Sequence, residues 1–217
     1  MKKWVGLAVL FLLISAAVLY FFVFNKKKDK KPADQENSSV ISSVSKQNEA
    51  FNLSVENMLT AYYAMNEGFV NWDTAAVRKQ AANFENTIDS FKVSELKTDS
   101  VNLESVERSV NAIKAESKAI AEDNNLADQR GSLNILSQAL FGLLKQVKYD
   151  RSKIYFQECP MAFDDVNPGN WLSAQKEIRN PYMGTSHPKY KSGMIKCGST
   201  KEVINYTGNV SVEKDSH

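Results

Sequence analysis

The only two cysteines of the chain each have a methionine within three residues. Cys159 stands two residues before Met161, and Met194 stands three residues before Cys197. Thiolates and thioethers are soft ligands, and soft ligands favour soft metal ions such as Cu(I). The same cysteines could instead form one disulfide, closing a loop of roughly forty residues and stabilising the fold by about 3–4 kcal/mol. The residues alone leave a metal site and a structural cross-link equally open.

The spacing within each pair allows the sulfur atoms to converge. In an extended backbone Cys159 and Met161 lie on one side of the chain, and one turn brings Met194 beside Cys197. Four sulfur atoms suit Cu(I), whereas Zn²⁺ would prefer more thiolates or histidines and Mg²⁺ or Ca²⁺ would need oxygen ligands. Met183 and His187 lie between the two pairs and are reserve ligands. In the disulfide alternative the methionines would only fill gaps in the core.

No catalytic constellation is visible in the sequence. The two histidines are His187, in a loop, and His217, at the very end of the chain. The chain has no G-x-S-x-G, no glycine-rich phosphate loop and no H-E-x-x-H. The acidic pair Asp164-Asp165 is typical of a solvated turn. We therefore predict that the protein is not an enzyme.

The elements that must position the sulfurs begin with four helices. Apolar residues recur at alternating spacings of three and four, which places each set on one helix face. The four sets are Phe51, Val55, Met58, Tyr62, Met65 and Phe69; Val77, Ala81, Phe84, Ile88 and Phe91; Leu103, Val106, Val110, Ile113 and Ile120, with Ser117 filling the place between the last two; and Leu133, Leu136, Leu140, Leu143 and Val147. The pattern predicts a mainly α fold, with an up-down four-helix bundle over residues 48–150.

The sequence changes character after residue 150. Four of the five prolines and five of the nine glycines lie in this part of the chain, which indicates turns. The run Ile154-Tyr155-Phe156 is typical of a short strand. We predict a small irregular C-terminal subdomain with short strands over residues 151–208, which carries both sulfur pairs, and a disordered tail over residues 209–217.

The N-terminus carries a membrane segment. Residues 4–24 are apolar apart from Ser15 and Tyr20, and this length spans about 30 Å as a helix, the thickness of a bilayer core. A cleaved signal peptide is the alternative. We predict an uncleaved transmembrane anchor in residues 1–25 and a polar linker in residues 26–47. The lysines between residues 26 and 31 are expected to face lipid headgroups or water.

Two opposing signals in the sequence bear on which side of the membrane the domain lies. More lysines follow the apolar segment than precede it, which favours a cytoplasmic domain by the positive-inside rule. A very short basic N-terminus favours export, and on this ground we predict a single-pass inner-membrane protein with its domain in the periplasm. The net charge of +2 is too small to indicate nucleic-acid binding.

Four blocks of the C-terminal region resemble a known pattern. The blocks are Cys159-Pro160-Met161-Ala162, Trp171-Leu172-Ser173, Ile178-Arg179-Asn180-Pro181-Tyr182-Met183-Gly184 and Met194-Ile195-Lys196-Cys197-Gly198. In this order they resemble the C-P-M-A, W-L-S, I-x-N-P-Y-x-G and M-x-x-C-G blocks of an uncharacterised domain family of Gram-negative bacteria. Members occur alone or appended to periplasmic adaptor subunits of heavy-metal and copper efflux pumps. The chain departs from the pattern where Thr185 to Gly193 intervene between the last two blocks, bringing His187 with them.

The resemblance implies an association with metals by context. Together with the sulfur pairs, it predicts a membrane-anchored, extracytoplasmic protein that binds a soft metal, copper as Cu(I) first, for resistance or efflux. The expected ligands are Cys159, Met161, Met194 and Cys197. Expected partners are the inner membrane and components of a metal efflux adaptor or pump. The alternative is a structural or interaction module of the cell envelope with a Cys159–Cys197 disulfide and no metal.

Overall fold

The computed structural model describes residues 47–96 and 103–207, which all fall within one compact unit. The predicted membrane anchor, nearly all of the predicted linker and the predicted C-terminal tail lie outside the described residues. Among the residues that the structure does describe, no helix has the length and apolar character needed to cross a membrane.

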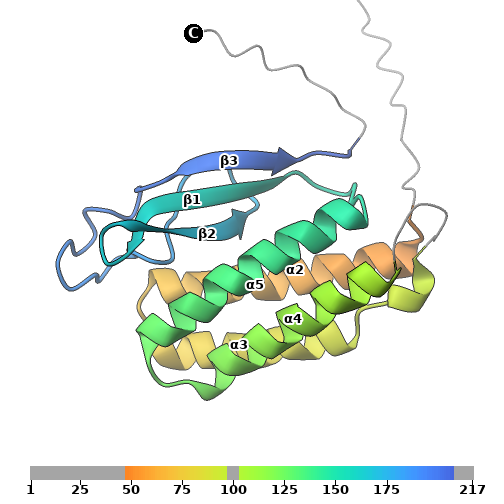
Figure 1. The fold of residues 1–217 in the computed structure, drawn as a ribbon, viewed down its shortest axis with the longest axis horizontal. Coiled ribbons are helices and arrows are strands. Elements are labelled where there is room, and N and C mark those ends of the chain that lie inside the picture. The colour runs from red at the N-terminus through yellow and green to blue at the C-terminus, as the bar shows by residue number, and fades with distance from the viewer. Residues whose placement is uncertain (1–46, 97–102, 208–217) are drawn as a thin grey trace, which may run out of the picture. The chain divides into compact units, whose positions relative to one another are not determined.

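Four long helices in an up-down arrangement confirm the predicted bundle (Figure 1). They are α2 (Glu49–Val70), α3 (Thr74–Asp89), α4 (Leu103–Glu122) and α5 (Leu126–Gln146), with a short 3-10 helix, η1 (Val93–Glu95), after α3. The predicted apolar faces of α2, α3 and α5 are buried in one core. In α4 the face is shorter than predicted, because Leu103 at its start is 40% exposed.

Polar residues begin three of the helices as N-caps. The side chain of Asn48 accepts the backbone N–H of Phe51 at 2.8 Å, and that of Asp73 accepts the N–H of Ala76 at 2.9 Å. Asn125 does the same at the start of α5. Each of these oxygens satisfies one backbone donor that has no partner within the helix, which fixes where the helix begins.

The C-terminal part is more regular than predicted, because it contains a three-stranded antiparallel sheet in the order β2-β1-β3. The strands are β1 (Ile154–Phe163), β2 (Asn167–Ser173) and β3 (Ser199–Ile204). The strand predicted at residues 154–156 therefore continues through the first sulfur pair. Pro160 is accommodated because the pairing of β1 with β2 shifts register between Cys159 and Phe163, where a missing backbone donor costs no ladder hydrogen bond.

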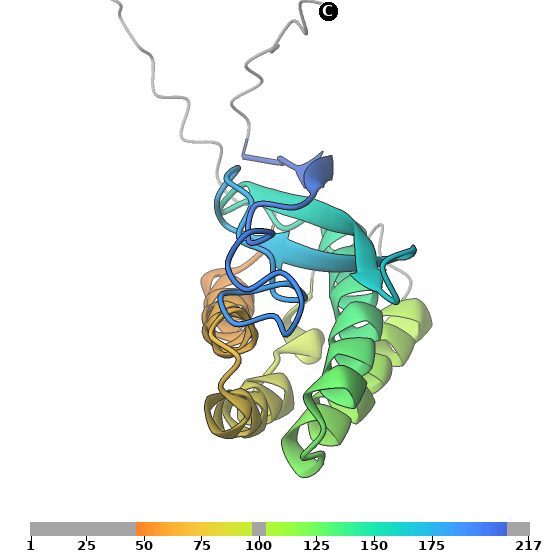
Figure 2. The ribbon, with the colours of Figure 1, turned by 90° about the vertical axis from the view of Figure 1, so that its left-hand side faces the viewer.

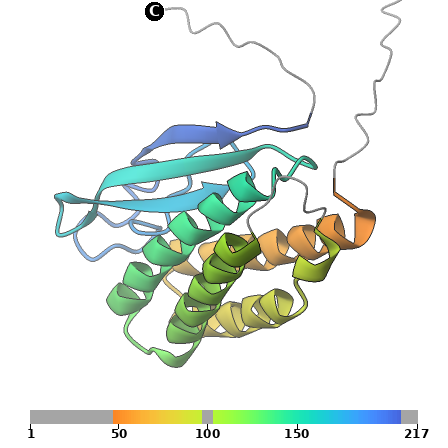
Figure 3. The same cartoon turned by 45° about the vertical axis from the view of Figure 1, so that its right-hand side comes forward.

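The two faces of the sheet have different coverings. Phe156 of β1 stacks on Phe141 of α5 with ring centroids 4.2 Å apart, so this face packs on the bundle (Figure 3). Because side chains alternate along a strand, Gln157 and Cys159 lie on the opposite face. The segment between β2 and β3, drawn in blue in Figure 2, contacts this face through Gln175 and Cys197, which hydrogen-bond to Gln157 and Cys159. The Gln157 amide donates to the carbonyl of Gln175 at 3.1 Å.

Helix side chains seal the outer edge of β2. The Tyr62 hydroxyl accepts the backbone N–H of Leu172 at 3.0 Å, and Asn66 donates to the carbonyl of the same residue at 3.2 Å. Two residues earlier, the side chain of Asn134 accepts the N–H of Asn170 at 2.8 Å. An edge strand normally exposes these groups, and here they instead fix the position of the sheet on α2 and α5.

Candidate functional site

The fold brings the two thiols together. Cys159 Sγ and Cys197 Sγ lie 3.0 Å apart, and neither sulfur is in a disulfide. Cys159 is fully buried in β1, whereas Cys197 is partly exposed just before β3. The separation lies between the ~2.05 Å of a disulfide bond and the roughly 3.8 Å between two thiolates on one ion with 2.3 Å bonds. Small shifts would therefore convert this arrangement into either state.

A tight turn presents Cys197 to the strand. Its backbone N–H donates to the carbonyl of Met194 at 2.9 Å, so the predicted single turn between these two residues is present. The turn is joined to a second one, because the Asn180 side chain donates to the carbonyl of Cys197 at 2.8 Å.

Gly198 permits the close approach of this turn to β1. It has a φ of +132°, a conformation that side chains disfavour, and an added Cβ would lie 2.5 Å from the carbonyl oxygen of Glu158. It would also lie 3.1 Å from the Trp171 ring. Only glycine fits between the Cys197 turn and the residue that precedes Cys159. The glycine after the second cysteine is thus part of what brings the thiols together.

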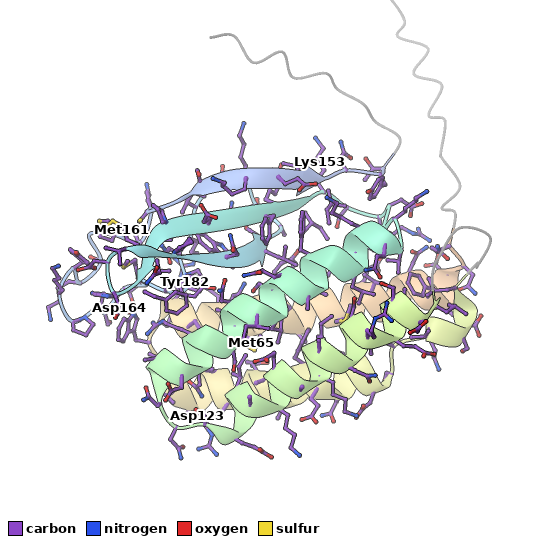
Figure 4. The ribbon with its side chains drawn as sticks, in the orientation of Figure 1. Met65, Asp123, Lys153, Met161, Asp164 and Tyr182 are labelled. Carbon is purple, nitrogen blue, oxygen red and sulfur yellow. The ribbon has the colours of Figure 1, made fainter. Side chains whose placement is uncertain are left out.

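The methionines of the two sulfur pairs stand beside the thiols in the chain. Met161 lies two residues beyond Cys159 on β1, at the end of the sheet where the loop segment gathers (Figure 4). Met194 begins the turn that Cys197 ends. Both methionine side chains are half-buried and pack against the edge of the core. Beyond this proximity in the chain, no described contact joins either thioether to a thiol.

The two reserve ligands have other surroundings. Met183 is buried, and its carbonyl accepts the Trp72 indole N–H at 2.9 Å. His187 Nδ1 accepts the backbone N–H groups of Lys189 at 3.2 Å and Tyr190 at 3.3 Å. A neutral imidazole that accepts through Nδ1 carries its proton on Nε2, so His187 in this arrangement has no free lone pair for a metal. No described contact joins either residue to the thiol pair.

The environment keeps both His187 and Cys197 uncharged at neutral pH. Partial burial and then the charge of Arg130 lower the pKa of His187. Burial, and next the hydrogen bond with Cys159, raise the pKa of the Cys197 thiol to about 12. Cys197 is therefore a poor nucleophile, and a metal ion would have to displace its proton.

The thiol pair is not part of a larger cluster of histidine, cysteine, aspartate or glutamate side chains among the described residues, 47–96 and 103–207. Zinc sites of the structural kind use four such ligands, and calcium and magnesium need several oxygens. The donor chemistry at Cys159 and Cys197 accordingly fits a soft ion that accepts two thiolates and tolerates thioethers.

The sequence-based interpretation missed Arg130, a buried cation that holds the segment around Pro181 to the helical bundle. Its side chain is only 6% exposed, donates to the carbonyls of Pro181 at 3.1 Å and Phe69 at 3.3 Å, and lies 3.9 Å from the centre of the Trp72 ring. Burial lowers its pKa to about 10, so it remains charged at neutral pH. One signal was available, because Arg130 lies one turn before Leu133 on the apolar face of α5.

The arrangement defines a class: an up-down four-helix bundle whose last helix leads into a three-stranded sheet carrying a thiol pair. Residues 58–152 match the model of an uncharacterised domain family, described as a protein of unknown function (DUF3347). This match runs from the middle of α2 to the residues before β1, so the thiol pair lies beyond it. Searches of curated proteins and of solved structures found no match to the chain.

Proposed function

We propose that the protein binds a soft metal ion, Cu(I) first, through the thiolates of Cys159 and Cys197. The observation that carries this proposal is the 3.0 Å separation of two sulfur atoms that are far apart in sequence. Met161 and Met194 are the proposed thioether ligands, because each lies within three residues of a cysteine in the chain and its side chain is half-buried. Met183 and His187 remain outside this primary set, since their described contacts bind them elsewhere.

The proposed setting is the outer face of the inner membrane. The apolar residues 4–24 support an anchor, and the C-terminal blocks support an association with metal efflux. In this setting the protein would hold copper for resistance, or pass it to an efflux adaptor or pump component. Two thiolates and a pair of thioethers suit transfer, because soft ligands can be exchanged one at a time with similar ligands of a partner.

An anaerobic Cu(I) titration against a chromogenic chelator tests the binding. We expect one copper ion per chain and the loss of both free thiols from reaction with a thiol reagent. Cys159→Ser and Cys197→Ser should each abolish binding, and Met161→Leu should weaken it. Met58→Leu is the matched control, because Met58 is buried in the bundle core. Unchanged copper binding in Cys159→Ser would refute the proposal.

The same distance supports a second candidate, a structural module of the cell envelope in which Cys159 and Cys197 form a permanent disulfide. The buried position of Cys159 in β1 and the turn that holds Cys197 are also what a cross-link would need. Counting thiols on protein isolated without reductant separates the two candidates. Two reactive thiols that copper then protects favour metal binding, whereas no thiols and no copper uptake favour the disulfide.

A further inference from the structure

Asn180 links the loop before the second cysteine to the turn that holds it. The residue is fully buried. Its backbone N–H donates to the carbonyl of Ile195 at 2.9 Å, and its side-chain amide donates to the carbonyl of Cys197 at 2.8 Å. Two hydrogen bonds from one residue therefore hold the short turn that presents the Cys197 thiol, one at Ile195 within it and one at Cys197 at its end.

The side-chain oxygen of Asn180 stabilises the turn that Asn180 itself begins. Its side-chain oxygen accepts the backbone N–H of Tyr182 at 2.8 Å and that of Met183 at 3.1 Å. Its backbone carbonyl accepts the N–H of Gly184 at 2.9 Å. Every polar group of Asn180 thus has a partner. The orientation of the amide is fixed, because a flip would place its oxygen against the carbonyl of Cys197.

Hydrogen bonds fix the turn that begins at Asn180 to the helical bundle. Arg130 donates to the carbonyl of Pro181, and the Trp72 indole donates to that of Met183. The N–H of Thr185 donates to the last carbonyl of α2, at Val70, at 2.8 Å. Asn180 is therefore the connection between a segment that the bundle holds in place and the turn of Cys197.

We propose that Asn180 is the positioning residue of the thiol pair, holding the Cys197 turn at the distance from β1 at which the two sulfur atoms meet. Asn180 does not touch Cys159, so its effect acts through the backbone of Cys197. The inference rests on the proposed function only in taking the thiol pair as the site. It requires that loss of the Asn180 amide changes the chemistry of the thiols, beyond any effect on stability.

Equilibrium with glutathione measures how well the thiols meet, without any metal. Oxidised glutathione is reduced to two molecules of glutathione as the Cys159 and Cys197 thiols lose two electrons and two protons and form one S–S bond. The equilibrium constant of this exchange gives the effective concentration of one cysteine thiol with respect to the other. The constant falls when the Cys197 turn moves away from β1. The measurement is made on the whole chain, with acid quenching and separation of the two forms.

Two variants of Asn180 and one matched control are compared. Asn180→Ala removes both side-chain roles, whereas Asn180→Asp keeps the oxygen that accepts Tyr182 and Met183 and replaces the donor to Cys197. Asn66→Asp is the control, because Asn66 is 8% exposed and also donates to a strand carbonyl, that of Leu172, away from the thiols. Unfolding in urea reports the stability of each variant separately.

We expect the equilibrium constant to fall about tenfold or more in both Asn180 variants, the change that one buried hydrogen bond commonly makes. Asn66→Asp should lose similar stability and keep the constant within about twofold of the wild type, as an independent site does. Equal falls in all three variants, or none in the Asn180 pair, would overturn the proposal. Because no copper is present, the result is independent of the copper titration.

The unaltered chain supplies a second measurement should the Asn180 variants not fold. Hydrogen exchange of the Asn180 side-chain amide is followed by nuclear magnetic resonance in the dithiol and disulfide forms. Slow exchange in both, with a shift of this amide signal on oxidation, is expected of a group bonded to the Cys197 carbonyl. Fast exchange, or a signal that does not respond to the state of the thiols, contradicts the proposal.

Discussion

Replacing Gly198 by alanine should separate the thiols and weaken the whole sheet. The added Cβ would lie 2.5 Å from the carbonyl oxygen of Glu158, a backbone atom that cannot rotate away. The φ of +132° adds strain of about 1–3 kcal/mol for a residue with a side chain. Relieving the clash by moving β3 away from β1 costs about another 1–3 kcal/mol. We expect a total loss of about 2–6 kcal/mol in unfolding free energy.

Urea denaturation followed by circular dichroism measures this loss. A thermal scan should show a fall of about 10 °C, since a domain of this size loses roughly 2–4 °C per kcal/mol. Gly142→Ala is the matched control, because Gly142 lies within α5 and an added Cβ there meets nothing within 4 Å. That substitution should stabilise the protein by about 0.5–1 kcal/mol, the advantage of alanine over glycine in a helix.

The thiols supply an independent readout of the same variant. If Gly198 allows the approach of Cys197 to Cys159, the alanine variant should form the disulfide more slowly under a mild oxidant than the wild type. The Gly142→Ala variant should oxidise at the wild-type rate. A Gly198→Ala protein with wild-type stability, to within about 0.5 kcal/mol, and wild-type oxidation would refute the reasoning from close approach.

Three further measurements test the packing around the site. Burial raises the pKa of the Tyr62 and Tyr182 phenols, so their contribution to stability is full below about pH 10 and is lost as the pH rises further. An alkaline titration should show both phenols ionising only as the protein unfolds. Ionisation of either phenol in the folded protein would contradict this. Tyr62→Phe should cost about 1–3 kcal/mol in urea because the Leu172 N–H loses its acceptor, and Tyr63→Phe should cost less. Arg130→Met should cost about 2–4 kcal/mol and change the fluorescence of Trp72, whereas a neutral outcome would show that the two carbonyls find other donors.

The helices could be predicted because their signal is periodic and local. Phe51 to Phe69 and Leu133 to Val147 follow one face of a helix, and the predicted faces are buried. An N-cap such as Asp73 is an equally local feature, because its side chain bonds a backbone N–H only three residues further on. Strand β1 was predicted only at its beginning, because Pro160 argues against a strand unless a register shift accommodates it, and that shift depends on β2.

Both a metal site and a disulfide require the thiols of Cys159 and Cys197 to meet, and the fold brings them together. What the sequence could not provide is how it is achieved, since Asn180, Gly198 and Arg130 act through contacts with residues distant in the chain. An asparagine before proline is typical of any turn, and the donation from Asn180 to the Cys197 carbonyl becomes visible only when both turns are placed. The approach of Gly198 to Glu158 likewise depends on the pairing of β3 with β1.

The direction of β1 determines which pole of the domain the sulfur atoms occupy. Lys153, just before the strand, and Met161, near its end, lie at opposite ends of the sheet in Figure 4. Gln47, where the described chain begins, donates to the carbonyl of Val147 and so belongs to the Lys153 end. Met161 therefore lies at the end of the domain away from residue 47, and α2, whose 22 residues span about 33 Å, runs between the two ends.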